Sequence, residues 1–352
     1  MRVREVGVVG FAQSRQMRQT TGTTNGVEML VPLITEVFSD LGLTKHDIGF
    51  WCSGSSDYLA GRAFSFVSAV DATGPVPPIN ESHVEADAAW ALYEAWTKIQ
   101  TGEVDTALVY GFGKSSAGDL RRTLALQLDP YVLAPLWPDS LAIAGLQAQL
   151  GIDQGKWSEQ AMAEVAVRSR RDAETNPNAQ LAGSKDVDSL LAEPYIAQPL
   201  RRHDCAPITD GAAVVVLAAE HRAGELAERP AWISGIAHAI DSAHIGARDL
   251  TTSPSTLTAA QKAGIDGVEV AELYTPFTHQ ELLLRAELGL GDDVRITPSG
   301  GALAGNPMFA GGLVRIGEAA RQIWSGSAGR VLAHATGGPA LQQNLVCVME
   351  GR

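Results

Sequence analysis

Cysteine is scarce in this chain, and its three residues, Cys52, Cys205 and Cys347, are far apart. Three scattered thiols form neither a disulfide framework nor the paired spacing of a zinc site. Long apolar runs are also missing, so the sequence offers no candidate membrane span. The first ten residues lack the apolar core and cleavage site of a signal peptide. We therefore expect a reduced, cytoplasmic protein without a bound metal.

Positive charge is in deficit, because 27 Lys and Arg residues stand against 40 Asp and Glu residues, giving a net charge of −13. An acidic chain of this kind is a poor nonspecific ligand for nucleic acid, so we expect no nucleic-acid partner. The 352 residues are 45% apolar, which is an ordinary globular composition. This length can bury one large core or two medium ones.

Two stretches of the chain share one pattern, residues 79–113 and residues 305–338. In each, a polar or Gly-rich turn leads into a helix of small residues, and a second turn then leads into an apolar strand. The N-terminus of such a helix carries partial positive charge, which favours chemistry at the preceding turn. The repeat indicates an internal duplication and places candidate site residues in the turns.

The rest of the chain divides in the same way, into an N-terminal half (1–222) and a C-terminal half (223–352). Each half predicts strand, helix, strand, helix, strand, and an irregular lobe of helices and loops is inserted at about 115–198. Such a duplication predicts an α/β fold of two stacked sheets with the equivalent helices packed between them. The other expected elements are strands at 3–10, 48–52, 232–239, 268–273 and 344–349 and helices at 25–41, 159–171, 255–264 and 281–288.

Three segments carry a family resemblance: DCAPITDGAA at 204–213, ELYTPFT at 272–278 and GGALAGNPMFAG at 300–311. They resemble the thiolase superfamily, in its sterol-carrier-protein thiolase or lipid-transfer branch. The resemblance covers essentially the whole chain and implies a thiolase-like, five-layered αβαβα fold with two duplicated halves. It also implies an acyl-CoA substrate and no separate cofactor. The substrate-binding residues it implies are Gly301, Gly305, Gly337 and Gly338.

The chain departs from this family at its catalytic positions. By alignment, Val84 stands where thiolases have the acylated cysteine, and valine cannot be acylated. Asn306 replaces the histidine of the family's Gly-His-Pro motif, and Tyr274 replaces an asparagine or histidine. Ordinary thiolysis or Claisen condensation is therefore not expected.

The chain is similar to family members that lack this cysteine and act as aldolases on steroid side chains attached to coenzyme A. The resemblance implies retro-aldol cleavage together with a small partner that has an OB fold and a zinc ribbon. That reaction needs a base for a hydroxyl proton and donors for a developing enolate. The candidate catalytic residues are Tyr274 as base or acid, Asn306 as enolate donor, His334 as a group titrating in the useful range, and His83.

Other interpretations of these residues stay open. Glu85 and Asp87 contribute a base beside His83 or simply cap the following helix. A non-catalytic subunit that scaffolds a partner or binds acyl-CoA would also lack the usual catalytic side chains. A thiolase that uses Cys52 or Cys205 would need a rearranged site. The resemblance further implies a homodimer core, or a heteromer with a thiolase-like or OB-fold and zinc-ribbon protein.

Overall fold

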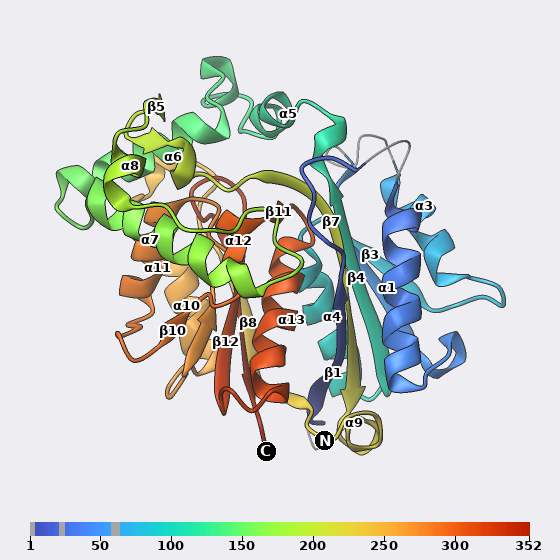
Figure 1. The fold of residues 1–352 in the computed structure, drawn as a ribbon. Helices are drawn as coiled ribbons and strands as arrows, with labels where there is room; N and C mark the ends of the chain where they lie inside the picture. Colours follow the sequence, from blue (N-terminus) through green and yellow to red (C-terminus); the bar gives the residue numbers. More distant parts are fainter. Residues whose placement is uncertain (1–3, 21–24, 58–63) are drawn as a thin grey trace.

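Two half-sheets, with helices between them and on both outer sides, give the protein five layers (Figure 1). The structure is a computed structural model, and it describes residues 4–20, 25–57 and 64–352. The predicted α/β fold with two duplicated halves is confirmed, because the strands of the two halves follow the same spatial order.

The N-terminal half-sheet has the strand order β3-β2-β4-β7-β1, and the C-terminal half-sheet has the order β10-β9-β12-β13-β8. In each, the first three strands are parallel and the last two are antiparallel to their neighbours. The N-terminal strands are β1 (Val6–Gln13), β2 (Phe50–Gly54), β3 (Glu81–Val84), β4 (Thr106–Lys114) and β7 (Ile208–Ala219). The C-terminal strands are β8 (Ala231–Ile240), β9 (Val270–Glu272), β10 (Arg295–Ile296), β12 (Arg330–Gly337) and β13 (Gln343–Glu350).

The half-sheets are joined at one end, which the sequence did not indicate. There β1 pairs with β8 through Gly7 opposite Trp232 and Val8 opposite Ala231. The strands of both halves therefore form one hydrogen-bonded sheet. Beyond this short contact the half-sheets separate, and two helices fill the space between them (Figure 1).

The central helices are α4 (Ala88–Gln100) and α13 (Gly311–Trp324), the equivalent helices of the two repeats. Every residue of α13 from Gly311 to Ala320 is buried, as expected for a helix enclosed on all sides. On the outer faces, α1 (Gly26–Leu41) and α3 (Ser65–Thr73) cover the N-terminal half-sheet. The helices α10 (Pro254–Ala263) and α11 (Thr278–Glu287) cover the C-terminal one.

The inserted lobe lies over one end of the half-sheets (Figure 1). Its helices begin at polar caps, since Asp139, Ser158 and Asp186 each accept a hydrogen bond from the first turn. Its elements are α5 (Leu120–Leu126), α6 (Ser140–Asp153), α7 (Glu159–Asp172), α8 (Val187–Leu191), β5 (Tyr195–Ala197) and β6 (Leu200–Arg201). The division of the chain at 222/223 stays a prediction; that point falls within the short helix α9 (Glu220–Leu226).

Several expected boundaries were wrong. The first strand runs from Val6 to Gln13 instead of 3–10, and Val3 lies outside the described residues. The predicted polar turn before α4 contains the strand β3, because the backbone of β2 supplies a partner that a polar sequence does not reveal. The helix α11 begins at Thr278, where four consecutive polar residues are buried under the lobe.

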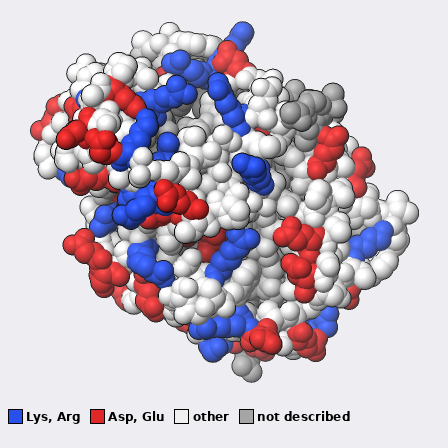
Figure 2. All heavy atoms as spheres, viewed as in Figure 1, with Lys and Arg blue, Asp and Glu red and all other residues white. Residues whose placement is uncertain are grey.

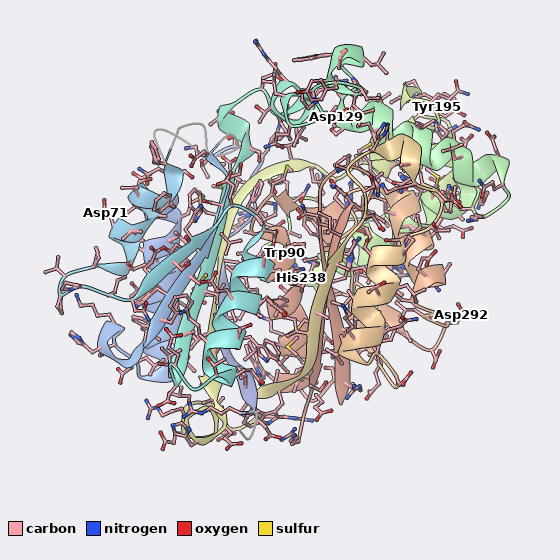
Figure 3. The ribbon with its side chains drawn as sticks, turned by 180° about the vertical axis from the view of Figure 1, so that it is seen from behind. Asp71, Trp90, Asp129, Tyr195, His238 and Asp292 are labelled. Atoms are coloured by element: carbon pink, nitrogen blue, oxygen red, sulfur yellow. The ribbon has the colours of Figure 1, made fainter. Side chains whose placement is uncertain are left out.

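No helix among the described residues is long and apolar enough to cross a membrane. On the back of the molecule, Figure 3 places Trp90 of α4 and His238 of β8 at the same level. The ring of Tyr93, one turn after Trp90, contacts the His238 ring edge-on with centroids 4.8 Å apart. An aromatic contact thus links the central helix α4 to the strand β8 on this side.

Candidate active site

Tyr274 and Asn306 form a buried hydrogen-bonded pair beside the start of α13. The Tyr274 hydroxyl donates to Asn306 Oδ1 at 2.7 Å, and the two residues are 5% and 7% exposed. Burial, reinforced by the charge of Asp87, raises the pKa of Tyr274 above its usual range. Tyr274 is therefore held in its protonated form, which argues against the expected role as base.

The hydrogen bond from Tyr274 fixes the orientation of the Asn306 amide. With Oδ1 accepting from Tyr274, the Nδ2 group of the same planar amide points away from the Tyr274 hydroxyl. An amide N–H held in this way can donate to a substrate oxygen that becomes negative. The pair is thus suited to stabilising an oxyanion.

The lobe holds the segment that leads to Asn306, which includes α12 (Gly301–Ala304) and β11 (Asn306–Pro307). Its carbonyls accept hydrogen bonds from lobe residues: Ser169 Oγ to Gly300 at 2.5 Å, Arg170 Nε to Leu303 at 3.1 Å, and Asn176 Nδ2 to Ser299 at 3.0 Å. The backbone N–H groups of residues 180 and 181 both donate to the carbonyl of Ala304. The position of Asn306 therefore depends on the lobe.

On its inner side the same segment is held by a buried ion pair. Arg315 Nη1 lies 2.8 Å from Glu272 Oε2 and donates to Ser299 Oγ at 2.5 Å. The Ser299 backbone N–H donates to Glu272 Oε1 at 3.0 Å. Burial raises the pKa of Glu272, and the Arg315 guanidinium opposes that shift. Sequence reasoning missed this cluster, because Glu272 and Arg315 belong to different elements.

Asp87 joins the two central helices at their N-termini. Its Oδ1 accepts from the Ala89 N–H at 2.9 Å, and its Oδ2 accepts from the Gly312 N–H at 2.9 Å. The expectation that Asp87 caps the helix is confirmed for α4, and the contact with α13 is new. Burial raises the pKa of Asp87 to about 6, although the backbone N–H groups and Arg315 oppose the shift.

Two consecutive glycines let these side chains approach α13. A Cβ atom on Gly311 would lie 2.5 Å from Tyr274 Cζ, and one on Gly312 would lie 2.4 Å from Asp87 Oδ1. The small residues at the start of this repeated helix thus allow the close approach. Tyr274 and Asp87 therefore lie against neighbouring residues at the same helix end.

His334 lies on the opposite face of the C-terminal half-sheet, so the structure does not bring it to this pair. Along β12, Ala333 and Ala335 face the central layer, whereas Leu332 faces the outer one. His334 shares the outer face, where its Nε2 lies 2.9 Å from Asn344 Oδ1. Burial lowers the pKa of His334 to about 4, so the expectation that it titrates near neutral pH was wrong.

His83 lies in the edge strand β3 and not at the start of α4. Its Nδ1 is 2.9 Å from Ser53 Oγ, and its ring stacks on Phe66 with centroids 4.7 Å apart. Val84 is the last residue of β3, paired with Gly54. The side chain at the start of α4 is therefore that of Asp87.

The three thiols lie outside this pair and are held in the neutral form. Burial raises the pKa of Cys52 above its usual range and the pKa of Cys205 to about 12. Cys347 is fully buried in β13, and burial raises its pKa to about 12 as well. A nucleophile must be a thiolate at neutral pH, so these positions argue against thiol chemistry.

The glycines expected to contact substrate fall in two places. Gly301 and Gly305 are buried in the segment before Asn306. Gly305 packs on the Gln16 amide, and a Cβ atom on Gly305 would lie 1.8 Å from Gln16 Oε1. Gly337 is half-buried at the end of β12, and Gly338 is exposed with φ +72°. Their role in substrate binding stays a prediction.

Comparisons with known proteins agree with this architecture. No protein-family model matches the chain. The acetyl-CoA acetyltransferase of Methanothermobacter thermautotrophicus is 28% identical over 72% of this chain and 73% of its own length. Sterol carrier protein 2 of Gallus gallus is 24% identical over 97% of this chain and 70% of its own length.

A solved structure described as an Ltp2-ChsH2(DUF35) aldolase superposes with a TM-score of 0.80, at 19% sequence identity over 99% of this chain and 98% of that chain. At this identity the superposition shows only that the two proteins share a fold, over nearly the full length of both chains. The chain is thus similar in sequence to thiolase-superfamily proteins, sterol carrier protein 2 included, and it has a thiolase-like fold.

Proposed function

We propose that this protein catalyses retro-aldol cleavage of a β-hydroxyacyl-CoA thioester, with a steroid or lipid side chain as the acyl group. The observation that carries the proposal is the Tyr274–Asn306 hydrogen bond of 2.7 Å beside the N-terminus of α13. It presents an amide donor suited to an enolate oxygen, in a superfamily site where this chain has no cysteine. The cleavage forms no acyl-enzyme, so it needs no thiolate.

In this proposal Asn306 Nδ2 donates to the thioester oxygen as the carbon–carbon bond breaks and negative charge develops there. Donors fixed in advance in a water-poor site typically contribute a factor of about 10² to 10³ in kcat. Tyr274 acts as a positioning residue, because its hydroxyl holds the Asn306 amide in one orientation. The lobe and the Glu272–Arg315 pair support that geometry from two sides.

The charge distribution supports an anionic substrate. Figure 2 shows Lys and Arg side chains in a band across the upper and central part of one face, with acidic side chains mostly nearer its margins. Such a band favours a ligand that carries phosphate groups, even though the whole chain is acidic. Coenzyme A is such a ligand, and as part of the substrate it leaves no need for a separate cofactor.

A second chain belongs to the proposal. The aldolase named in the structural comparison is a complex of two named components, one marked DUF35. We extend this to a small OB-fold and zinc-ribbon partner of the present chain, on a homodimeric or heteromeric thiolase-like core in the cytoplasm.

A β-hydroxy steroid-acyl-CoA tests the proposal directly. The purified chain is incubated with it, with and without a small OB-fold and zinc-ribbon protein, and released ketone and shortened acyl-CoA are quantified. We expect cleavage that iodoacetamide does not inhibit. Asn306→Ala should lower kcat by about 100-fold, whereas Tyr131→Phe, at an 87% exposed tyrosine, should leave it unchanged. Absence of cleavage in both conditions would refute the proposed reaction.

One observation favours a second candidate, a non-catalytic subunit that scaffolds a partner. Tyr274, Asn306 and Asp87 are only 5%, 7% and 6% exposed, and the hydrogen bond from the Gly312 N–H to Asp87 joins the two halves inside the protein. Under this alternative, titration calorimetry would detect binding of the partner or an acyl-CoA without product formation. Under the aldolase proposal, the same mixture releases ketone.

A further inference from the structure

We propose that Asp87 is the base that accepts the β-hydroxyl proton of the substrate, an inference that rests on the proposed retro-aldol function. The hydroxyl proton passes to the Asp87 carboxylate, and the oxygen's electron pair forms the ketone C=O bond. The carbon–carbon bond breaks, and its electron pair goes to the α-carbon as a thioester enolate. Asp87 then returns the proton to that carbon, so substrate splits into ketone and shorter acyl-CoA without a further reactant.

The first argument is the placement of the Asp87 carboxylate. It lies where the N-termini of α4 and α13 meet, and each of its oxygens accepts one backbone N–H at 2.9 Å. The backbone N–H of Leu313 also acts on Asp87. A carboxylate has about four acceptor positions, so these backbone donors leave capacity for a substrate hydroxyl. The partial positive charges of the two helix ends stabilise the ionised form, which is the form that accepts a proton.

The second argument is the position of Asp87 relative to the proposed oxyanion donor, Asn306. Asp87 lies against Gly312, and Tyr274 lies against Gly311, the preceding residue of the same helix. Tyr274 is in turn bonded to Asn306. The proposed base and the proposed enolate donor thus stand at one helix end, as required for groups that act on the β-hydroxyl and the thioester oxygen of one substrate.

The third argument concerns the charged groups around Asp87. Arg315 on α13 and the phenol of Tyr274 act on it electrostatically, and Glu272 on β9 is paired with Arg315. Burial outweighs the stabilising contacts and raises the pKa of Asp87 to about 6. A base whose pKa lies near the working pH is ionised and still basic enough to accept a proton.

The other candidate bases fail on position or protonation. Burial keeps Tyr274 protonated, and His334 lies on the far face of the half-sheet. His83 lies in the edge strand, bonded to Ser53. Asp87 remains the acid–base group that shares the helix end with Asn306.

The test compares Asp87→Asn with Asp186→Asn in the full-length chain, using the same β-hydroxy steroid-acyl-CoA. Asp186 also caps a helix, by accepting from the Ser189 N–H, but lies exposed on the lobe. We expect Asp87→Asn to lower kcat by at least about 100-fold, the usual contribution of a general base, with little change in KM. The wild type should lose kcat below about pH 6, and this acidic limb should vanish in the variant. Asp186→Asn should match the wild type.

A structural cap alone would not move the pH profile, so the profile separates the two roles. If Asp87→Asn keeps kcat, or loses it while the acidic limb persists, the inference is overturned. Asp87→Ser serves if the asparagine variant does not fold, because serine still caps a helix but has no carboxylate. A wild type that never cleaves refutes the proposed function, whereas a wild type that cleaves beside a fully active Asp87→Asn refutes only the assignment of the base.

Discussion

Arg315 of α13 and Glu272 of β9 form an ion pair of 2.8 Å in the central layer, with side chains 3% and 0% exposed. Ser299 completes the cluster by bonding to both residues. The pair links a central helix to the half-sheet and, through Ser299, to the segment that carries Asn306. Its loss should therefore affect stability and the site together.

Glu272→Gln should lower the free energy of unfolding by about 3–5 kcal/mol, because it leaves the buried Arg315 charge without its counterion. Urea unfolding followed by circular dichroism measures the change. The double variant Glu272→Leu/Arg315→Met removes both charges and should be more stable than Glu272→Gln. A single variant as stable as the wild type would contradict the buried pair. Glu103→Gln, at an exposed pair with Lys98, is the control.

Gly311→Ala should disturb the Tyr274 ring, because the added Cβ would stand 2.5 Å from Tyr274 Cζ. We expect a loss of about 1–3 kcal/mol in stability, as for other overpacked cores, and a fall in aldolase activity. Gly224→Ala is the matched control. It lies within the helix α9, and no atom lies within 4 Å of the place where a Cβ would stand. Alanine there should leave the stability of the protein unchanged or raise it by up to about 1 kcal/mol. Equal stabilities for the two variants would argue against the contact.

Ser169→Ala should lower the stability slightly and kcat more strongly. The change removes the hydrogen bond from Ser169 Oγ to the Gly300 carbonyl, at a cost of about 1 kcal/mol in unfolding free energy. Because that carbonyl belongs to the segment before Asn306, we expect kcat to fall by about 10-fold, as small misplacements of a donor do. Ser325→Ala, at an exposed serine, should change neither quantity. An unchanged kcat in Ser169→Ala would show that the lobe does not position Asn306.

His334→Gln should make the protein less sensitive to acid. The pKa of His334 is about 4 in the folded chain, below the usual value of 6.5, because the charged form is buried. The unfolded chain therefore binds more protons between pH 6.5 and 4, and stability is lost as the pH falls through this window. This residue accounts for about 3 kcal/mol of that loss, at 1.36 kcal/mol for each pKa unit.

Unfolding free energies of wild type and His334→Gln at pH 7 and pH 4 measure this effect. Both proteins contain Asp87, so its contribution cancels when the pH dependence of one unfolding free energy is subtracted from that of the other. The raised pKa of Asp87 stabilises the folded chain as the pH falls, which is opposite to the effect of His334. His46→Gln, at an exposed histidine, is the control. A pH dependence equal to that of the wild type would show that His334 is not buried in its neutral form.

The sequence by itself determined the duplicated α/β architecture, because the two repeats have the same order of turn, small-residue helix and apolar strand. It also selected Tyr274 and Asn306, whose motifs carried the family resemblance and which the structure joins by one hydrogen bond. The resemblance also led to the expectation that Val84 stands in place of the family's cysteine.

Only the tertiary structure decided what lies beside that pair. A one-residue alternation in β12 places His334 on the outer face, and burial lowers its pKa, neither of which a motif reveals. Asp87 and Gly312 are 225 residues apart in sequence, yet the packing of two central helices brings them to 2.9 Å. Hydrogen bonds and pKa values depend on the groups that surround a side chain, and in the central layer those groups come from both halves of the chain.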